Sequence, residues 1–161
     1  LARLGHEWQG DVIIVTQNID DLHEQAGQVN VWHMHGVLGR ALCMKCRAAC
    51  EYKGDLSTAT ACVSCGAVGG MRPDVVWFGE IPRHLKEIEA ALADCVLYCS
   101  IGTSGEVSPA SQFVMDARRG GALTVELNIA ITCRSLQHNE ELRGPASVTV
   151  PQLVDMLLTK S

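Results

Sequence analysis

The sequence has no long apolar run, no excess of basic residues and no internal repeat. Its longest apolar runs are as short as Val12–Val15, so none of them could span a bilayer. The net charge of −5 gives no reason to expect nucleic acid as an obligate partner. Eight cysteines in 161 residues are too few for a disulfide scaffold, whereas a hydrophobic content of 47% suits an ordinary globular core.

Short apolar runs alternate with helix-like segments along most of the chain. A buried strand is expected at Val12–Thr16, because both of its faces are apolar, and further buried strands are expected at Val96–Ile101 and Leu123–Leu127. Shorter strands are expected at Val29–Trp32, Val75–Phe78 and Val148–Val150. The expected helices are Asp21–Ala26, Leu85–Ala93, Ser108–Arg119 and Pro151–Leu158. Asp21 and Glu24 would form a capping box in the first helix, and Ser108 would be the N-cap of the third. This alternation predicts an α/β protein with a mostly parallel sheet covered on both faces.

The segment from Cys43 to Pro73 interrupts this alternation. It is rich in cysteine, glycine and small polar residues, and it shows little apolar periodicity. Such a segment buries little core, so something other than a core must order it. We therefore expect one domain over residues 1–42 and 74–161 and a separate small module over residues 43–73.

Four of the cysteines form two Cys-x-x-Cys pairs, Cys43 with Cys46 and Cys62 with Cys65. Each pair can hold two thiolates on one turn, and two such turns complete a tetrahedron around Zn²⁺. The spacing predicts one structural zinc ion, because four sulfurs leave no position open for a reactive water. The alternative is two disulfides or unbound thiols. Metal-bound cysteines fit a reducing compartment, which we expect to be the cytoplasm.

Three of the expected strands end in polar residues. Ligands of open α/β sheets bind at the carboxyl ends of the strands. A Gly-Thr-Ser-Gly turn alone is weak evidence, since many such turns merely connect a strand to a helix. Three polar strand ends together favour a nucleotide ligand. They are Gln17–Asp20, Gly102–Ser104 and Glu126–Asn128.

Two histidines alternate in the sequence His33-Met34-His35-Gly36. Histidine is the usual general base near neutral pH, and on a strand these two side chains would share one face. The spacing alone does not choose between them, and either could be a histidine whose hydrogen bonds are satisfied within the fold.

These motifs occur together in the order and spacing of one family. The segments TQNIDDLHEQAG, HMHG, the paired Cys-x-x-Cys, RPDVVWFGE, IGTSGEVSPA, VELN and GPA resemble the sirtuins, the NAD-dependent protein lysine deacylases. The form VVWFGE is most similar to the branch that includes bacterial deacylases. The resemblance covers essentially the whole chain, and it implies a Rossmann-like, doubly wound fold with a small zinc-binding module.

The resemblance assigns a set of NAD-binding residues. Asn18 and Asp20 would hold the nicotinamide carboxamide and the nearby ribose, and Gln17 would contact a ribose. His35 would be the catalytic base, with His33 in a supporting position. The remaining cofactor contacts that the resemblance implies are Ile19, Gly102, Thr103, Ser104, Asn128, Ile129, Ala130 and Ala146.

The resemblance also implies a site for acylated-lysine proteins or peptides. An extended peptide would add to one segment by β-augmentation, and a loop would lie on its other side. The carbonyl of Val76 would accept a hydrogen bond from the acyl-lysine Nε–H, and Phe78 would line the lysine tunnel. The alternative is that Trp77 and Phe78 are core aromatics. The substrate residues are Val76, Trp77, Phe78, Gly79, Glu80, Glu106 and Val107.

The implied reaction transfers the acyl group from lysine to ADP-ribose and releases nicotinamide, with His35 taking a proton from a ribose hydroxyl. A second hypothesis is an ADP-ribosyltransferase on the same fold. A third is an inactive fragment that acts only as a zinc-containing binding module. The mild basic excess over Cys43–Arg72 gives the third little support, since such an excess usually marks a solvated face.

One motif of the family has no counterpart in this sequence. Sirtuins begin their nucleotide-binding domain with a strand and a Gly-Ala-Gly-x-Ser loop, and the sequence opens at Leu1 in what resembles a later helix. The first strand of a doubly wound sheet is central, so its neighbours would lack a partner without it. We therefore expect residues 1–161 to come from a longer enzyme and to bind NAD poorly alone. Acetyl, succinyl and malonyl groups all remain open as substrates.

Overall fold

Two compact units make up the chain in the computed structural model, which describes residues 1–159. The first, here called the terminal unit, comprises Leu1, Arg3–Asp11 and the chain from Lys86 onward. The second, here called the central unit, comprises Ala2 and Val12–Leu85. The segment 43–73 groups with the central unit, and its status as a separate zinc-binding domain stays a prediction.

The terminal unit is built on a parallel sheet of three strands. These are β6 (Leu97–Ile101), β7 (Leu123–Asn128) and β8 (Glu140–Arg143), in the order β6-β7-β8. The central strand β7 is buried on both faces over four successive residues, as expected for a buried strand, and its second face buries Thr124 and Glu126. Its Val125 and Leu127 form the core of this unit together with side chains of the C-terminal helix.

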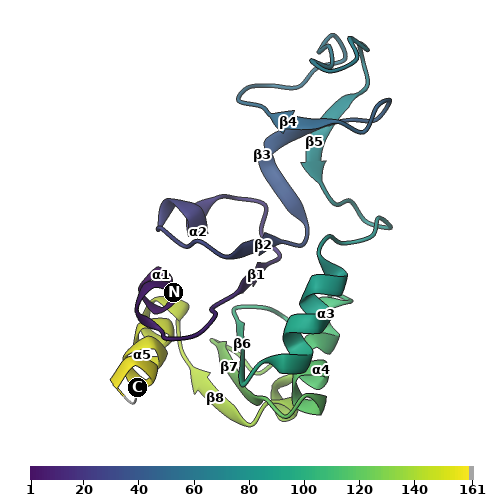
Figure 1. Cartoon of the computed structure of the whole chain (residues 1–161). Helices are drawn as coiled ribbons and strands as arrows, with labels where there is room; N and C mark the ends of the chain where they lie inside the picture. The colour runs from purple at the N-terminus through teal and green to yellow at the C-terminus, as the bar shows by residue number, and fades with distance from the viewer. Residues whose placement is uncertain (160–161) are drawn as a thin grey trace. The chain divides into compact units, whose positions relative to one another are not determined.

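Helices lie on both sides of this sheet (Figure 1). Helix α3 (Leu85–Asp94) and helix α4 (Phe113–Arg119), which a 3-10 turn at Ala110–Gln112 precedes, lie on one side. Helix α5 (Ala146–Thr159) lies on the other side, next to α1 (Ala2–Glu7). None of the described helices is both long and apolar enough to cross a membrane.

The central unit begins with a parallel β-α-β element. Strand β1 (Ile14–Thr16) pairs with β2 (Val31–His33), and the short helix α2 (Leu22–Gln25) lies between them in the sequence. Gly27, with φ of +87°, follows the end of α2, as the sequence predicts for a residue just past a helix. Among the described residues, β1 pairs only with β2 and β6 only with β7, so each is an edge strand of its sheet.

The rest of the central unit is an antiparallel sheet that carries the cysteine-rich segment. Its strands are β3 (Gly36–Cys43), β4 (Ala49–Glu51) and β5 (Met71–Val75), in the order β4-β3-β5. The α/β class with parallel sheets is therefore confirmed, and the antiparallel sheet is confined to the part of the chain where the sequence loses its α/β alternation.

The predicted strand at Val148–Val150 and the predicted helix start at Pro151 are wrong. Helix α5 runs through both positions, and the last strand is β8. Three consecutive β-branched residues favour a strand in isolation, but burial of Thr149 against the unit, together with its hydroxyl bond to the Pro145 carbonyl, overrides that preference. Pro151 sits early in the helix, where it removes a single i→i−4 bond.

Four local predictions are also wrong. The strand expected at Val75–Phe78 ends at Val75, because a tight turn follows. The capping box at Asp21 and Glu24 does not form: the Leu22 amide donates instead to Asp20 Oδ1 at 3.2 Å. Ser108 does not cap the later helix, whose first turn is 3-10. The strand expected to be buried at Val12–Thr16 is mostly half-buried, and only Thr16 is fully buried.

Strand β3 passes very close to β5 at Gly36. This glycine has φ of +85°, a conformation that residues with a Cβ adopt at a cost. A Cβ added there would lie 2.2 Å from the carbonyl oxygen of Asp74 and 2.7 Å from the Cα of Val75. The sheet can therefore close at this point only around a glycine.

We expect Gly36→Ala to lower the free energy of unfolding by about 3 kcal/mol, because the new methyl group overlaps backbone atoms that cannot move independently. The matched control is Gly39→Ala in the same strand, where an added Cβ meets nothing within 4 Å. We expect this control to change the free energy by less than about 0.5 kcal/mol in a denaturant titration. Equal effects of the two substitutions would contradict the close approach.

Candidate functional site

The polar end of β1 lies beside the turn that carries the second histidine of the pair. The amide of Leu38 donates to the carbonyl oxygen of Ile19 at 2.8 Å, which aligns the residues after β1 with the start of β3. His35 Nδ1 lies 2.9 Å from the carbonyl oxygen of Gln17. The structure therefore brings His35 into contact with the predicted cofactor segment Gln17–Asp20.

The contact with Gln17 assigns the tautomer of the neutral His35 ring. A carbonyl oxygen can only accept, so Nδ1 carries the proton and donates it. In the neutral ring Nε2 is then the nitrogen with the free lone pair. No hydrogen bond of Nε2 is seen among the described residues, so this atom can take a proton from a ligand.

His33 is bound differently. Its Nε2 lies 2.7 Å from Glu24 Oε1, and its Nδ1 lies 3.4 Å from the carbonyl oxygen of Asn18. The ring is buried, with 8% of the residue exposed. Both nitrogens are thus engaged in joining β2 to α2 and to the end of β1. This geometry favours His35 over His33 as a base, a choice that the sequence spacing leaves open.

Asn18 and Asp20 flank this contact. Asn18 is exposed, and its backbone amide donates to Thr16 Oγ1 at 3.1 Å, which turns the chain at the end of β1. Asp20 is half-buried and accepts the Leu22 amide at the start of α2. The Asn18 backbone and the Asp20 side chain are therefore held by short local bonds on the same stretch of chain that holds His35.

The predicted substrate segment begins where β5 ends. The Val76 amide donates to the carbonyl oxygen of His35 at 2.8 Å. Trp77 is 57% exposed and Phe78 is fully exposed, so the alternative of core aromatics is wrong for this structure. The turn Trp77–Glu80 instead presents two large apolar side chains to its surroundings.

The side chain of Glu80 holds this turn closed. The Trp77 amide donates to Glu80 Oε2 at 3.0 Å, and Arg72 Nη2 donates to Oε1 at 2.8 Å. The backbone bond from Trp77, and next the bond from Arg72, lower the pKa of Glu80. The guanidinium of Arg72 also lies 5.3 Å from the centre of the Trp77 ring, within the range of a cation–π contact.

A cavity lies within the terminal unit, at the carboxyl ends of β6 and β7. Its volume is about 300 Å³. Asn128 Nδ2 donates to the carbonyl oxygen of Thr103 at 2.8 Å, which joins the two strand ends. The predicted residues that line it are Gly102, Thr103, Ser104, Glu106, Asn128 and Ala130. Ile129, Ala146 and Val107 are exposed and do not line it.

Sequence reasoning missed the far wall of this cavity, which Ile131, Thr132 and Cys133 form. A buried glutamate on β7 holds that wall. Glu126 is 1% exposed, and it accepts a hydrogen bond at 2.6 Å from Thr132 Oγ1 and another at 2.6 Å from Arg143 Nη2. No spacing in the sequence links these residues, because they come together only when β7 and β8 pair.

Hydrogen bonds decide the ionisation of Glu126. Burial alone would raise its pKa, but the bonds from Ser135, Thr132 and Arg143 together outweigh burial and lower it. Ser135 begins the short 3-10 turn Ser135–Gln137, so the carboxylate anchors the loop that follows β7. Glu126 thus fixes the loop that contributes to the cavity without lining it.

The four paired cysteines converge at one point in the central unit. Their sulfurs all lie within 4.8 Å of one another, with 3.9 Å between Cys43 and Cys65 and 3.7 Å between Cys46 and Cys62. Tetrahedral zinc with bonds of roughly 2.3 Å requires sulfurs about 3.8 Å apart, so the cluster fits the ion. These separations exclude the disulfide alternative, since a disulfide bond is about 2.05 Å long.

The backbone around the cluster favours thiolates at two of the four positions, whereas at Cys46 a backbone hydrogen bond is outweighed by burial and the neighbouring sulfurs, which raise the pKa of that thiol. The amides of Cys65 and Ser64 donate to the sulfur of Cys62 and lower its pKa to about 6. The Cys46 amide is the largest influence on Cys43, and the pKa of Cys43 is also lowered. Thiolates are the form that binds zinc, so two of the four ligands are prepared for the metal by their own turns.

A sequence model of the Sir2 family matches residues 2–109. The chain belongs to the Sir2 family.

Relatives of this Sir2-family chain extend the match to nearly its whole length. It is 46% identical over 158 residues to a protein of Vibrio parahaemolyticus named NAD-dependent protein deacylase, covering 98% of the chain and 66% of that relative. It is 44% identical to the NAD-dependent protein deacylase SIR2rp3 of Leishmania major, covering 100% of the chain and 68% of that protein. The chain thus spans slightly less than two thirds of the Vibrio relative.

Solved structures give the same family. The crystal structure of a Sir2 homolog–NAD complex superposes with a TM-score of 0.88 at 31% identity, covering 99% of this chain and 62% of that one. The fold of the described residues is therefore that of Sir2 proteins, including the cysteine-rich segment.

We expect the purified Sir2-family chain to hold about one zinc ion per chain, measured by inductively coupled plasma mass spectrometry. Cys62→Ser should lose the metal, because a hydroxyl cannot replace a thiolate, and amide exchange over residues 43–73 should accelerate. Acidification should release the ion as the thiolates take up protons.

The matched control is Cys50→Ser. Cys50 lies in β4 of the same sheet but outside the four-sulfur cluster, so this variant should keep its zinc. Full zinc content in Cys62→Ser, or a mass showing two disulfides in the unmodified chain, would refute the site.

Proposed function

We propose that the natural protein containing this chain is an NAD-dependent protein lysine deacylase. The observation that carries the proposal is the position of His35. Its Nδ1 is tied to the Gln17 carbonyl, its Nε2 is free to take a proton, and its backbone carbonyl accepts the Val76 amide. A proton acceptor therefore lies between a predicted nicotinamide-binding segment and a predicted peptide-binding segment.

NAD is the proposed co-substrate, and the residues present fit its parts. When bound, NAD supplies the ribose carbon that the acyl oxygen attacks and the nicotinamide that leaves. The amide of Asn18 offers both a donor and an acceptor to a carboxamide, and Asp20 and Gln17 offer oxygens nearby. Ile19 belongs to the same segment. In the terminal unit, the cavity beside Gly102–Ser104, Asn128 and Ala130 suits ribose hydroxyls.

The role of His35 follows from its tautomer. Nε2 accepts a proton from a ribose hydroxyl, and the Gln17 carbonyl stabilises the resulting imidazolium through Nδ1–H. Because the carbonyl belongs to the backbone at the end of β1, the ring cannot rotate without breaking this bond. The four-sulfur site leaves no open coordination position, so the zinc braces the sheet and takes no part in proton transfer.

The proposed substrate is a protein or peptide with an acylated lysine. Main-chain bonds to Val76–Glu80 would give affinity with little demand on peptide sequence. The exposed Phe78 offers an apolar surface to the lysine chain. The relatives named deacylases support this class of substrate.

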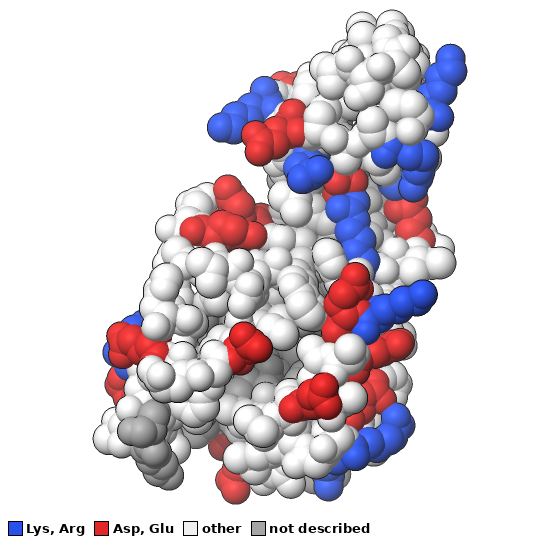
Figure 2. Space-filling view, in the orientation of Figure 1, with Lys and Arg blue, Asp and Glu red and all other residues white. Residues whose placement is uncertain are grey.

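Neither nucleic acid nor a membrane is part of the proposal. Figure 2 shows Lys and Arg of the described central unit interspersed with Asp and Glu on the face in view. This mixture gives no support to a nucleic-acid-binding zinc module. Eight cysteines without a disulfide among the described residues support a reducing location, for which we propose the cytoplasm.

The test is to incubate the natural protein with NAD and with acetyl-lysine and succinyl-lysine peptides, and to weigh the products. We expect free lysine peptide, nicotinamide and acylated ADP-ribose. His35→Ala should lower turnover by about 10² to 10⁴, the usual contribution of a general base. His23→Ala, a histidine of α2 with no assigned role, is the control and should keep the activity.

Two results would overturn the proposal. An ADP-ribosylated protein without deacylated peptide would assign the chain to ADP-ribosyl transfer. Undiminished peptide deacylation by His35→Ala would remove the proton acceptor from its assigned role.

A further inference from the structure

A buried carboxylate lies directly before the proposed peptide-binding segment. Asp74 is the fourth residue of β5, and only 4% of its side chain is exposed. A buried ion of this kind destabilises the fold unless charged or polar partners surround it. Neither the proposed reaction nor the sheet pairing uses this side chain, so its partners indicate what it does.

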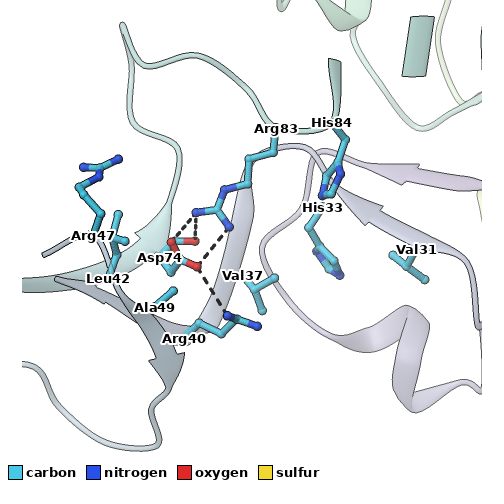
Figure 3. Close-up of a pocket in the computed structure, with 10 residues that line it drawn as sticks. All are labelled: Val31, His33, Val37, Arg40, Leu42, Arg47, Ala49, Asp74, Arg83 and His84. Atoms are coloured by element: carbon cyan, nitrogen blue, oxygen red, sulfur yellow. Dashed lines mark hydrogen bonds and ion pairs between the residues drawn. The ribbon is translucent and has the colours of Figure 1, made fainter. Parts of the chain in front are cut away.

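Arg83 is the principal partner of Asp74. Its Nη2 donates to Asp74 Oδ1 in a close contact and also to the Asp74 carbonyl oxygen at 3.2 Å, and its Nη1 donates to Oδ2 at 3.2 Å. Figure 3 shows the Arg83 guanidinium facing the carboxylate, with Arg40 reaching it from the other side. One guanidinium therefore grips both the side chain and the backbone of the same residue.

The backbone of Arg83 is bound to the histidine turn. Its amide donates to the carbonyl oxygen of Met34 at 2.9 Å, next to His35. The pair of Asp74 and Arg83 is here called the clasp. On its other side, Asp74 pairs with Val37 in the sheet register, and the Val76 amide donates to the His35 carbonyl. Arg83 thus joins the turn that carries the base to the strand end that carries the peptide-binding residues.

Arg40 makes a weaker contact with the same carboxylate. Its Nε lies 3.6 Å from Asp74 Oδ2, beyond ordinary hydrogen-bond length, and 46% of its side chain is exposed. Among the described residues, only Arg83 of the two arginines donates a hydrogen bond to the Asp74 backbone. The two arginines therefore differ in geometry while sharing charge and target, which makes Arg40 a matched control for Arg83.

The same residues line a cavity of about 510 Å³. Arg40 and Arg83 both face Asp74 in Figure 3. Arg83 is committed to a buried carboxylate that would be unstable without it, whereas Arg40 adds only the longer contact. The Arg83 guanidinium is therefore an internal partner of Asp74.

We propose that Asp74 and Arg83 are positioning residues that set the distance between Val76 and His35. This inference rests on the proposed function, because it assigns the clasp to the placement of the acyl-lysine peptide. Neither side chain contacts the base itself. Arg83 acts through the Met34 and Asp74 backbones, and a planar guanidinium with several donors is required to reach both oxygens and the carbonyl at once.

The test compares Arg83→Lys, Arg83→Gln and Arg40→Gln. Lysine keeps the charge but cannot bridge the carboxylate and the carbonyl together, so Arg83→Lys is expected to retain the fold. We expect both Arg83 variants to raise the KM for the acyl-lysine peptide by about tenfold and to leave the KM for NAD within about twofold. Arg40→Gln should change neither constant by more than about twofold.

A second readout does not depend on turnover. Hydrogen exchange at the Val76 amide reports its bond to the His35 carbonyl, and we expect it to accelerate about tenfold in Arg83→Lys. The Ile14 amide, which is bonded to the Asn30 carbonyl in the same central unit, should keep its rate. A general loss of stability would accelerate both. An unchanged Val76 rate, or an NAD KM that rises with the peptide KM, would overturn the clasp.

These outcomes separate the two proposals. If the unmodified natural protein fails to deacylate any acyl-lysine peptide, the proposed function fails, and the Val76 exchange still decides whether the clasp exists. If the unmodified protein is active but Arg83→Lys matches it in both readouts, the clasp alone is refuted.

Discussion

The hydrogen bond from His35 to the Gln17 carbonyl is the interaction on which the candidate site of the central unit depends. It joins the end of a parallel strand to the turn between β2 and β3, and it assigns the proton of the neutral ring to one nitrogen. The carbonyl that accepts it follows β1, whose pairing with β2 is fixed by three residue pairs. The base is therefore held by backbone atoms, which are harder to displace than side chains.

The surrounding sheet extends this constraint to the substrate side. Gly36 lets β3 approach β5 at a separation that no other residue allows, and the pairing of Gly36 with Val75 places Val76 against the His35 carbonyl. The four-sulfur cluster lies at the far end of the same three strands, since Cys43 ends β3. Zinc at that position would fix the strands whose other ends hold His35 and Val76. A metal ion without an open coordination position would thus stabilise the candidate site without taking part in proton transfer.

Much of this could be predicted from the sequence, because the signals were local. The Cys-x-x-Cys spacing predicts a cluster that the structure brings within 4.8 Å, and the segment Leu123–Leu127 is correctly expected to be a buried strand of the terminal unit. The first residues of helix α5 were missed because β-branched residues favour strands locally while tertiary burial of Thr149 decides otherwise. Asp74 with Arg83, and Glu126 with Arg143, were missed because their partners are 9 and 17 positions apart and meet only after folding.

The most direct test of the central claim is the tautomer of His35, observed by ¹⁵N-resolved nuclear magnetic resonance of imidazole-labelled protein at a pH where the ring is neutral. The account predicts a protonated Nδ1 and an unprotonated Nε2, and loss of this preference when the Gln17 segment is displaced. A ring protonated at Nε2, with Nδ1 unprotonated, would contradict the assignment of His35 as a base held by the Gln17 carbonyl.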